Sequence, residues 1–413
     1  MRPFPIRLRH ISNHRPLLPV LMAIVLALLP RSGQAQTQAI DSTAKTSPVV
    51  RIAGIGVPLI AEGLLVKSED KGFRQLRNHY APEFHSSFDN YLRYLPAAVL
   101  LGMKVGGVEG RSSWGRMLTS DAFSTAIMGA AVFSAKHIVH RTRPDGSDRE
   151  SFPSGHAATV FMTATMLNKE YGHLSPWVGI GAYTVATGTA VMRMANNKHW
   201  FSDVITGAGI GIISTEMGYY LADLIFKDRG LTRHPNTDLF YRDDRPSFAG
   251  VYVGFGLPLS DYKMKNGATY NTTTGNTIGA EAAWFFNPYL GIGGRFLLSN
   301  TGLMTGDDTA ENSYLDYYSI TAGPYFSYPL TSRLLLGSHL VAGQVHYGSL
   351  SVEGLTQPAA NRFTAGTGCS IAFRAHRHFT FRLFLDYNLY GPQDHGGPWL
   401  HTLTPGTSFA ATL

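Results

Sequence analysis

The sequence FTFRLFLDYNL, residues 379–389, alternates between apolar and polar side chains over most of its length. Leu383 and Leu385 stand at apolar positions, and Arg382 and Asp386 stand at polar positions beside them. Because successive side chains of a β-strand point to opposite faces of a sheet, this period of two predicts a strand with one apolar and one polar face. The C-terminal part of the chain is therefore expected to be β-sheet.

The same alternation recurs in eight runs through this part of the chain. The runs begin near residues 248, 277, 290, 315, 333, 363, 378 and 400. Aromatic residues gather near the ends of the runs, among them Tyr317, Tyr328 and Trp399. An even number of alternating strands with aromatic girdles is typical of a transmembrane barrel, whereas the alternative is a soluble β-sandwich, which also alternates. We predict an all-β, eight-stranded antiparallel barrel of the outer-membrane type over residues 247–413, although Leu413 departs from the aromatic residue that often ends such barrels.

The residues before the barrel follow a helical period instead. Six apolar segments lie at about 49–66, 94–110, 117–140, 156–169, 176–195 and 201–226. They predict an all-α helical bundle of about six helices within residues 36–226, followed by a polar linker at 227–246. Residues 88–96 are expected to form a short amphipathic helix that serves packing rather than chemistry. Polar residues such as Lys104 and Glu216 interrupt the longer segments, which favours a bundle in the periplasm or on the membrane surface over one that spans the membrane.

The first 35 residues have the features of a cleaved secretory signal peptide. A basic region precedes an apolar stretch at residues 17–30, and Gly33 to Ala35 supply a small-residue cleavage site. A retained membrane anchor is the alternative, but the stretch is shorter than the roughly 20 apolar residues that a span requires. Because five Arg and no acidic residue lie in residues 1–35, most of the formal net charge of +7 belongs to this segment. The rest of the chain is close to neutral, so no nucleic-acid partner is expected.

Three blocks of residues in the helical part carry groups that suit phosphate chemistry. In the first block, Lys136 and Arg143 are seven residues apart, a spacing that places both cations on one face of a helix closed by Pro144. Two fixed cations that converge on one point suit a phosphate group, because the planar guanidinium can bind two of its oxygens.

The second block is Ser154-Gly155-His156, which leads directly into an apolar segment. Gly155 allows the backbone to approach a ligand closely, and the amides of Ser154 and Gly155 would lie at a helix N-terminus, where anions are favoured. A histidine beside that anion can donate a proton to a leaving oxygen near neutral pH. His156 is therefore the candidate general acid.

The third block contains Arg193, His199 and Asp203. His199 and Asp203 are four residues apart, so on one helix the carboxylate would accept from Nδ1 of the imidazole and leave Nε2 basic. Arg193 supplies a third cation for a phosphate oxygen. Each block alone has an ordinary structural explanation, and His137 and similar histidines are interpreted as core residues. The three blocks together, in a fixed order on neighbouring helices, indicate a catalytic site.

The blocks resemble the three signature motifs of the type 2 phosphatidic acid phosphatase and vanadium-haloperoxidase superfamily, in its phosphatase branch. The positions that match the motifs are Lys136, Arg143 and Pro144, then Pro153, Ser154, Gly155 and His156, and then Arg193, His199 and Asp203. One position departs from the pattern, because Met192 stands where the family usually has Ser. The resemblance covers about residues 90–226 and does not extend to the barrel.

The resemblance implies a two-step phosphoryl transfer that needs neither a metal ion nor another cofactor. His199 would attack phosphorus while His156 protonates the leaving oxygen, and water would then hydrolyse the phosphohistidine. Lys136, Arg143, Arg193 and the amides of Ser154 and Gly155 would hold the phosphate oxygens. We expect a phosphatase that acts on lipid phosphate or diphosphate monoesters at the cell envelope, with its barrel in the outer membrane and its catalytic domain in the periplasm.

Several points stay open at the level of sequence. Phosphatidic acid, phosphatidylglycerol phosphate, polyprenyl diphosphate and lipid A are equally compatible substrates, and the sequence indicates no oligomeric state. A vanadate-dependent haloperoxidase would use the same pocket with vanadate in place of phosphate. A structural outer-membrane barrel with an inactive helical domain is the third interpretation, and the intact reactive positions argue against it.

Overall fold

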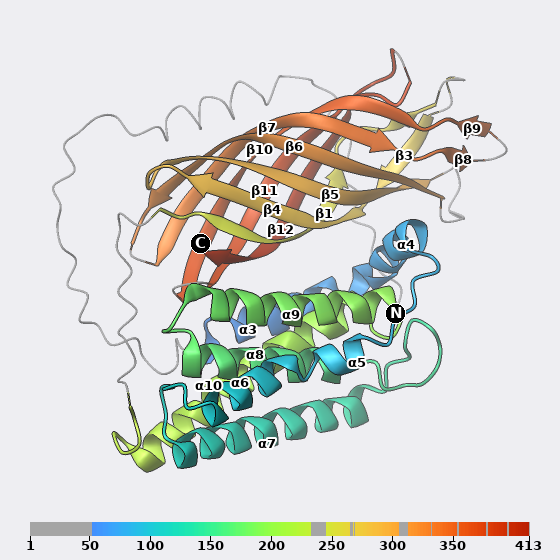
Figure 1. The fold of residues 1–413 in the computed structure, drawn as a ribbon. Helices are drawn as coiled ribbons and strands as arrows, with labels where there is room; N and C mark the ends of the chain where they lie inside the picture. Colours follow the sequence, from blue (N-terminus) through green and yellow to red (C-terminus); the bar gives the residue numbers. More distant parts are fainter. Residues whose placement is uncertain are drawn as a thin grey trace. The chain divides into compact units, whose positions relative to one another are not determined.

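The computed structural model describes residues 52–232 and 245–412, apart from short gaps at residues 265–266, 268, 305–312, 332, 353–354, 377–378 and 395. The predicted signal peptide at residues 1–35, residues 233–244 of the predicted linker, and Leu413 lie outside the described residues. Figure 1 shows a group of helices from the first part of the chain and a group of strands from the second. The predicted fold class, an all-α bundle followed by an all-β barrel, is confirmed.

Six helices coincide with the apolar segments predicted from the sequence. They are α3 (Gly56–Leu65), α6 (Leu95–Val105), α7 (Trp114–Val139), α8 (Gly155–Tyr171), α9 (Pro176–Ala195) and α10 (Phe201–Phe226). The short 3-10 turn η1 (Val66–Glu69) follows α3, and α5 (Asp89–Leu92) is the predicted short helix. Helix α4 (Asp70–Tyr80) was not predicted, because its two buried apolar residues, Phe73 and Leu76, stand in a polar stretch.

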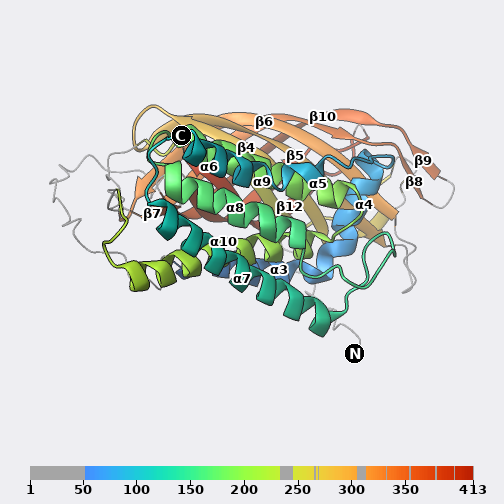
Figure 2. The ribbon, with the colours of Figure 1, turned by 60° about the horizontal axis from the view of Figure 1, so that its bottom comes forward.

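Helix α10 packs against α3, α7 and α8 through small residues. A Cβ atom at Gly211 would lie 2.3 Å from the main-chain oxygen of Ala158, and one at Gly218 would lie 2.6 Å from the main-chain nitrogen of Ser124. Figure 2 shows α7, α8 and α10 running side by side. Glycine at these positions therefore lets the helix backbones come into direct contact, as in other closely packed helix pairs.

The helix ends determine where the motif residues stand. Helix α7 ends at Val139 because His140 adopts a left-handed conformation, with φ of 44°. Arg143 therefore lies in the loop after α7, and the prediction that Lys136 and Arg143 share one helix face is wrong. At the start of α10, Asp203 accepts a hydrogen bond from the main-chain N–H of Trp200 at 3.0 Å, which caps the helix.

Eight of the described strands close into a barrel. In spatial order they are β5 (Leu290–Met304), β4 (Gly275–Phe285), β1 (Phe248–Pro258), β12 (Leu400–Thr412), β11 (Phe379–Tyr390), β10 (Ala360–His376), β7 (Leu334–Tyr347) and β6 (Ser313–Pro329), with β6 pairing back to β5. All these pairings are antiparallel. The short strands β2 (Tyr262–Lys263) and β3 (Thr269–Thr273) extend from β5, and β8 (Leu350–Val352) pairs with β9 (Leu355–Gln357).

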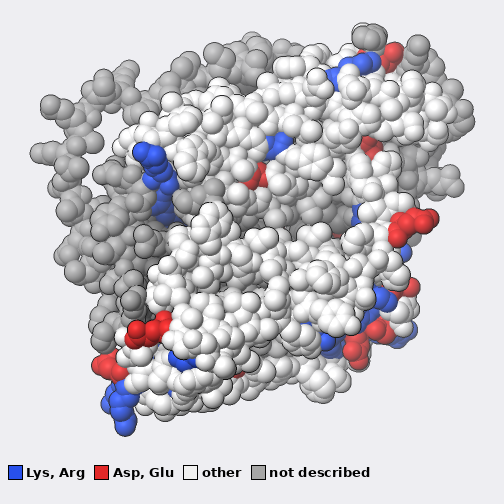
Figure 3. All heavy atoms as spheres, viewed as in Figure 1, with Lys and Arg blue, Asp and Glu red and all other residues white. Residues whose placement is uncertain are grey.

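The alternation in β11 separates the barrel wall from the lumen. Leu383 and Leu385 are 53% and 43% exposed, whereas Arg382 and Asp386 are 6% and 1% exposed. In the view of Figure 3, most of the described surface carries neither acidic nor basic side chains. An apolar outer wall with polar groups inside is the arrangement that a lipid bilayer requires of a barrel.

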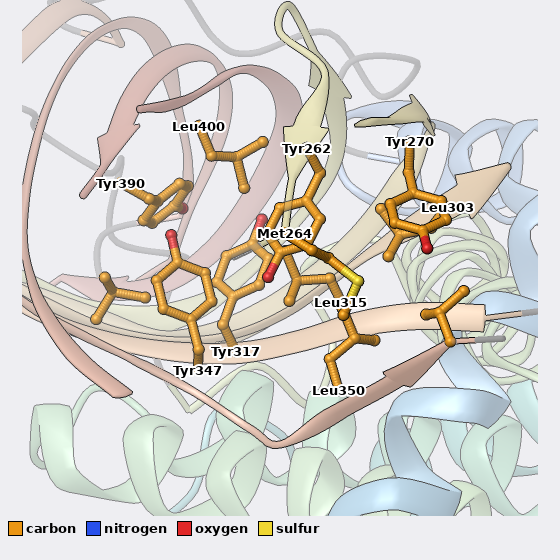
Figure 4. Close-up of a cluster of buried hydrophobic side chains, with 12 residues drawn as sticks. Tyr262, Met264, Tyr270, Leu303, Leu315, Tyr317, Tyr347, Leu350, Tyr390 and Leu400 are labelled. Atoms are coloured by element: carbon orange, nitrogen blue, oxygen red, sulfur yellow. The ribbon is translucent and has the colours of Figure 1, made fainter. Parts of the chain in front are cut away.

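Polar and aromatic side chains fill the lumen. Arg295 donates a hydrogen bond to the carboxylate of Asp386 at 2.5 Å, and both side chains are buried. Elsewhere in the lumen, Tyr317, Tyr347 and Tyr390 lie close together (Figure 4), with ring centroids 5.7 Å apart for Tyr317 and Tyr347 and 4.9 Å apart for Tyr317 and Tyr390. A barrel of this strand number has an interior just wide enough for such side chains to fill.

Candidate active site

His199 lies in the turn before α10 rather than within the helix. Its Nδ1 lies 2.7 Å from the main-chain oxygen of Ser151, and its Nε2 lies 3.2 Å from Nη1 of Arg143. Because a carbonyl oxygen can only accept a hydrogen bond, Nδ1 carries the proton and Nε2 carries the lone pair. The backbone of Ser151 therefore selects the tautomer in which Nε2 is the basic nitrogen.

The surroundings of His199 keep its imidazole neutral. Burial lowers the pKa of His199 well below its ordinary value, and Arg143, Arg193 and Lys136 lower it further. The three cations predicted from the sequence thus lie within electrostatic reach of one ring. A neutral imidazole among three cations is suited to attack an anionic phosphate, because the cations offset the charge of the incoming group.

Asp203 does not accept the Nδ1 proton of His199 as the sequence spacing suggested. Its Oδ2 lies 3.9 Å from that nitrogen, which is too far for a hydrogen bond. Asp203 instead accepts hydrogen bonds from Nη1 of Arg141 at 2.8 Å, from the hydroxyl of Ser151 and from the N–H of Trp200. Because Ser151 is the residue that holds His199, Asp203 positions the imidazole through Ser151.

Arg141 joins the site to the unpredicted helix α4. Its Nη2 donates to Asp70 at 2.6 Å, and Asp70 also accepts from the main-chain N–H of Ser202 at 2.9 Å. The α4 helix thereby ties the loop after α7 to the start of α10. The only sequence signal for Arg141 is its place in the first motif block, two residues before Arg143.

The first two predicted cations are held by the same loop. Arg143 donates through Nε to Asp148 at 2.7 Å and through Nη1 to the main-chain oxygen of Lys198 at 2.9 Å. Lys136, in the last turn of α7, donates to the main-chain oxygen of Glu150. These contacts orient both side chains. The sequence predicted that they share one helix face, but Lys136 comes from α7 and Arg143 comes from the loop after it.

Ser154, Gly155 and His156 begin helix α8. The Ser154 hydroxyl accepts a hydrogen bond from the N–H of Ala157 at 3.3 Å and caps the helix. The amide of Ser154 donates to the main-chain oxygen of Asp203 at 2.9 Å, so it is already engaged within the protein. Gly155 is the first residue of α8, and its amide belongs to the N-terminal N–H groups that lack a partner within a helix.

His156 is contacted by two residues of the segment 88–96, which the sequence predicted to serve packing rather than chemistry. Its Nε2 lies 2.9 Å from Oδ1 of Asn90 and 3.2 Å from Nη1 of Arg93. Burial lowers the pKa of His156 to about 3, and the cations Arg193 and Arg93 contribute to the decrease. A bound phosphate would oppose these cations and raise the pKa of His156 toward the range that a general acid requires.

Arg193, near the end of α9, pairs with Asp89 of α5. Its Nη1 donates to Oδ2 of Asp89 at 2.8 Å, and the two residues are 7% and 1% exposed. The site therefore combines a basic imidazole, a second histidine and three cations. Within the part of the chain that the structure describes, no group of three or more His, Cys, Asp or Glu side chains is arranged to hold a metal ion. This arrangement can support displacement at phosphorus by a nitrogen nucleophile.

Comparisons with known proteins identify the class of the helical part. Residues 117–225 match the PAP2 superfamily. This part of the chain is therefore a PAP2-superfamily domain, and the resemblance drawn from the sequence motifs is confirmed. The matched range contains Lys136, Arg143, Ser154, Gly155, His156, Arg193, His199 and Asp203.

Other known proteins and structures are similar to portions of this chain. The lipid A 1-phosphatase of Porphyromonas gingivalis is 41% identical over 226 residues, which cover 51% of this chain and 51% of that protein. The match therefore spans about half the length of this curated relative. The crystal structure of LpxE from Aquifex aeolicus is 20% identical and covers 35% of this chain and 92% of that chain, with a TM-score of 0.28. The crystal structure of Ail from Yersinia pestis is 18% identical and covers 40% of this chain and 98% of that chain, with a TM-score of 0.27.

Proposed function

We propose that this protein is a phosphatase that hydrolyses phosphate or diphosphate monoesters of lipids at the cell envelope. The observation that carries the proposal is His199, whose Nδ1 proton is held by the Ser151 carbonyl while its Nε2 lies beside Arg143. The similarity to a lipid A 1-phosphatase supports a lipid phosphate as the substrate class. Lipid A is accordingly the first of the four candidate lipids to test.

The reaction proceeds in two displacements. Nε2 of His199 forms a bond to phosphorus as the bond from phosphorus to the leaving oxygen breaks, and His156 gives that oxygen a proton. Water then attacks the phosphohistidine, which releases inorganic phosphate and restores the imidazole. Lys136, Arg143 and Arg193 neutralise the charge on the phosphate oxygens during both steps.

The chain acts at a membrane. The apolar outer wall of the barrel supports insertion in the outer membrane, and the catalytic domain then faces the periplasm. Exposed apolar side chains on α7, such as Phe133 at 64% and Ile138 at 79%, support contact between the bundle and the membrane surface. A site at that surface can reach the phosphate groups of lipids from the aqueous side.

The proposal is tested by phosphate release from purified protein and its His199→Ala variant. We expect His199→Ala to abolish turnover of lipid A, phosphatidic acid, phosphatidylglycerol phosphate, polyprenyl diphosphate and a soluble aryl phosphate, because no other group replaces the nucleophile. The matched control is His137→Ala, since His137 lies exposed on α7 and is not the core residue that the sequence suggested. Full activity of His199→Ala on any of these substrates would refute His199 as the nucleophile, and absence of phosphate release by the native protein from all the lipids would refute the phosphatase function.

Metal removal is a second test, because side chains supply the positive charge in this mechanism. Dialysis against EDTA should leave the rate of phosphate release unchanged. Vanadate should inhibit, since it can bind among the three cations in the geometry of the transition state. Loss of activity in EDTA that Mg²⁺ restores would contradict the metal-independent mechanism.

A further inference from the structure

Helix α5 and the residue after it lie outside the three motifs and outside the range that matches the PAP2 superfamily. Their side chains nevertheless contact two motif residues on two different helices. Asp89 accepts a hydrogen bond from Arg193 of α9, and Asn90 and Arg93 both lie within hydrogen-bond distance of His156 of α8. A single turn of helix therefore reaches both the candidate acid and one of the phosphate-binding cations.

The polar residues of this turn occupy one side of it. Asp89 and Arg93 are four residues apart and Asn90 and Arg93 are three apart, which are the spacings of side chains on one helical face. Asp89 is 1% exposed, whereas Tyr91, on the same turn, is 73% exposed. Asn90 is exposed and Arg93 is half-buried, so their contacts with His156, rather than burial, place these two side chains on the side of the site.

Two arginines at this turn, Arg193 and Arg93, each have an N–H group without a hydrogen-bond partner in the described structure. Among the described residues, Nε of Arg193 and Nε of Arg93 are both buried without a hydrogen-bond partner. Arg193 is 7% exposed. A buried donor without an acceptor is unfavourable, so these two N–H groups suit a site where a ligand supplies the acceptor. Arginine N–H groups suit the oxygens of an anionic ligand.

The hydrogen-bonding rules assign different roles to the two residues at His156. Arg93 can only donate, whereas Oδ1 of Asn90 can only accept. When Nε2 of His156 carries a proton, Asn90 is therefore its partner and the Arg93 donor is left for another acceptor. An imidazolium has protons on both nitrogens, so Asn90 can hold one proton while the other passes to the leaving oxygen.

We propose that Asn90 is a positioning residue for the general acid His156, and that Arg93 is a fourth cation that binds the phosphate ester on its leaving-group side. The proposal rests on the proposed phosphatase function. It adds a fourth segment, Asp89 to Arg93, to an active site otherwise defined by three motifs. The substrate class that it favours is an ester whose leaving group carries further oxygens near the scissile bond, such as a sugar phosphate or a diphosphate.

The role of Asn90 is tested with soluble aryl and alkyl phosphates of different leaving-group acidity. A good leaving group needs no proton in the transition state, whereas a poor one does, and general acid catalysis contributes roughly 10²–10⁴-fold. We expect Asn90→Ala to lower kcat for phenyl or alkyl phosphate by about tenfold or more and to change kcat for nitrophenyl phosphate little, the pattern also expected of His156→Ala. Asn90→Asp keeps an oxygen acceptor and should restore the poor substrates.

The role of Arg93 is tested by binding. Arg93→Gln should raise KM for the esters and weaken inhibition by inorganic phosphate by about tenfold, the loss expected from one charge-assisted contact of about 1.5 kcal/mol. Tyr91→Ala is the matched control on the same turn and should leave both the leaving-group dependence and phosphate inhibition unchanged with these soluble substrates.

Each outcome decides one question. If Asn90→Ala slows all esters equally while Asn90→Asp restores none, Asn90 is only structural and the proposal fails. If phosphate inhibits Arg93→Gln as strongly as the native protein, Arg93 is not a phosphate contact. Both results leave the phosphatase function intact, which fails if the native protein releases no phosphate from any of these esters.

Discussion

At the scale of the residue, the site depends on which nitrogen of His199 holds a proton. Burial and then the cations Arg143, Arg193 and Lys136 lower the pKa of His199 below its ordinary value of 6.5. A histidine with a lowered pKa keeps its lone pair as the pH falls, so kcat/KM should persist at pH values where an ordinary imidazole is protonated. The Ser151 carbonyl then ensures that the lone pair is on Nε2.

The variant Arg143→Gln should move the acid limb of the kcat/KM profile to higher pH. Loss of this cation raises the pKa of His199, so protonation removes the nucleophile at a higher pH than in the native protein. The plateau rate should also fall by about 10²-fold or more, because a contact to the transition state is lost. The same soluble aryl phosphate should be used with the native protein and the variant. The ionisation of the substrate then affects both pH profiles equally, and any difference between them comes from the protein.

Arg149→Gln is the control for this experiment, since Arg149 is an exposed arginine of the same loop. Its acid limb should coincide with that of the native protein. An unchanged limb in Arg143→Gln would show that Arg143 does not govern the ionisation of His199.

At the scale of the element, the start of α8 and the start of α10 carry His156 and Asp203, so the contact between these helices fixes the distance between the two halves of the site. Gly211 stands at that contact, because a Cβ there would lie 2.3 Å from the main-chain oxygen of Ala158. The main chain of α8 cannot move aside as a flexible side chain can. A larger residue at position 211 must therefore push α8 and α10 apart.

Gly211→Ala should lower the free energy of unfolding by about 1–3 kcal/mol and reduce phosphatase activity with it. Gly181→Ala in α9 is the matched control, since no atom lies within 4 Å of the position of its Cβ. Alanine there should be neutral or stabilise the helix by about 0.5–1 kcal/mol. Thermal unfolding of both variants in detergent, followed by helical circular dichroism, measures the difference. Equal midpoints for the two variants would contradict the close-contact role of Gly211.

At the scale of the whole molecule, a barrel and a bundle of membrane-spanning helices would be exported by different routes. A barrel must cross the periplasm unfolded, whereas helices that span a membrane are retained in the inner membrane. Among the described helices, α7 is long and apolar enough to cross a membrane by length and composition, and 17% of its most apolar 18-residue stretch is buried. The sustained alternation of the strands favours export, and with it a bundle at the periplasmic surface.

Membrane separation should therefore place the full chain in the outer-membrane fraction. The segment from about residue 36 to residue 245, produced alone with its signal peptide, should be released from membranes by carbonate or high salt, because surface contacts are weaker than insertion. Immunoblotting of the fractions gives the result. Recovery of this segment as an integral inner-membrane protein would reverse the assignment.

The sequence alone was enough to predict features that depend on neighbouring residues. The period of two in residues 379–389 reflects the geometry of a strand, so the barrel and the burial of Arg382 and Asp386 could be predicted from it. The helical period located α9 and α10 at their observed bounds. Helix α4 could not be predicted in this way, because its stability comes from burying Phe73 and Leu76 against other elements rather than from its own pattern.

The three motifs likewise located the residues of the candidate site, because a motif is a local spacing of side chains along the chain. Only the tertiary structure decided which groups hold them. His199 is held by Ser151, 48 residues away, Asp203 by Arg141, 62 residues away, and His156 by Asn90, 66 residues away. Such contacts form only when separate helices pack together. Which residues meet then depends on where the helix ends lie in space, and not on the periodicity of the sequence. For this physical reason the sequence was enough to predict the residues of the candidate site, whereas the fold determined their hydrogen bonds and brought α5 into contact with His156 and Arg193.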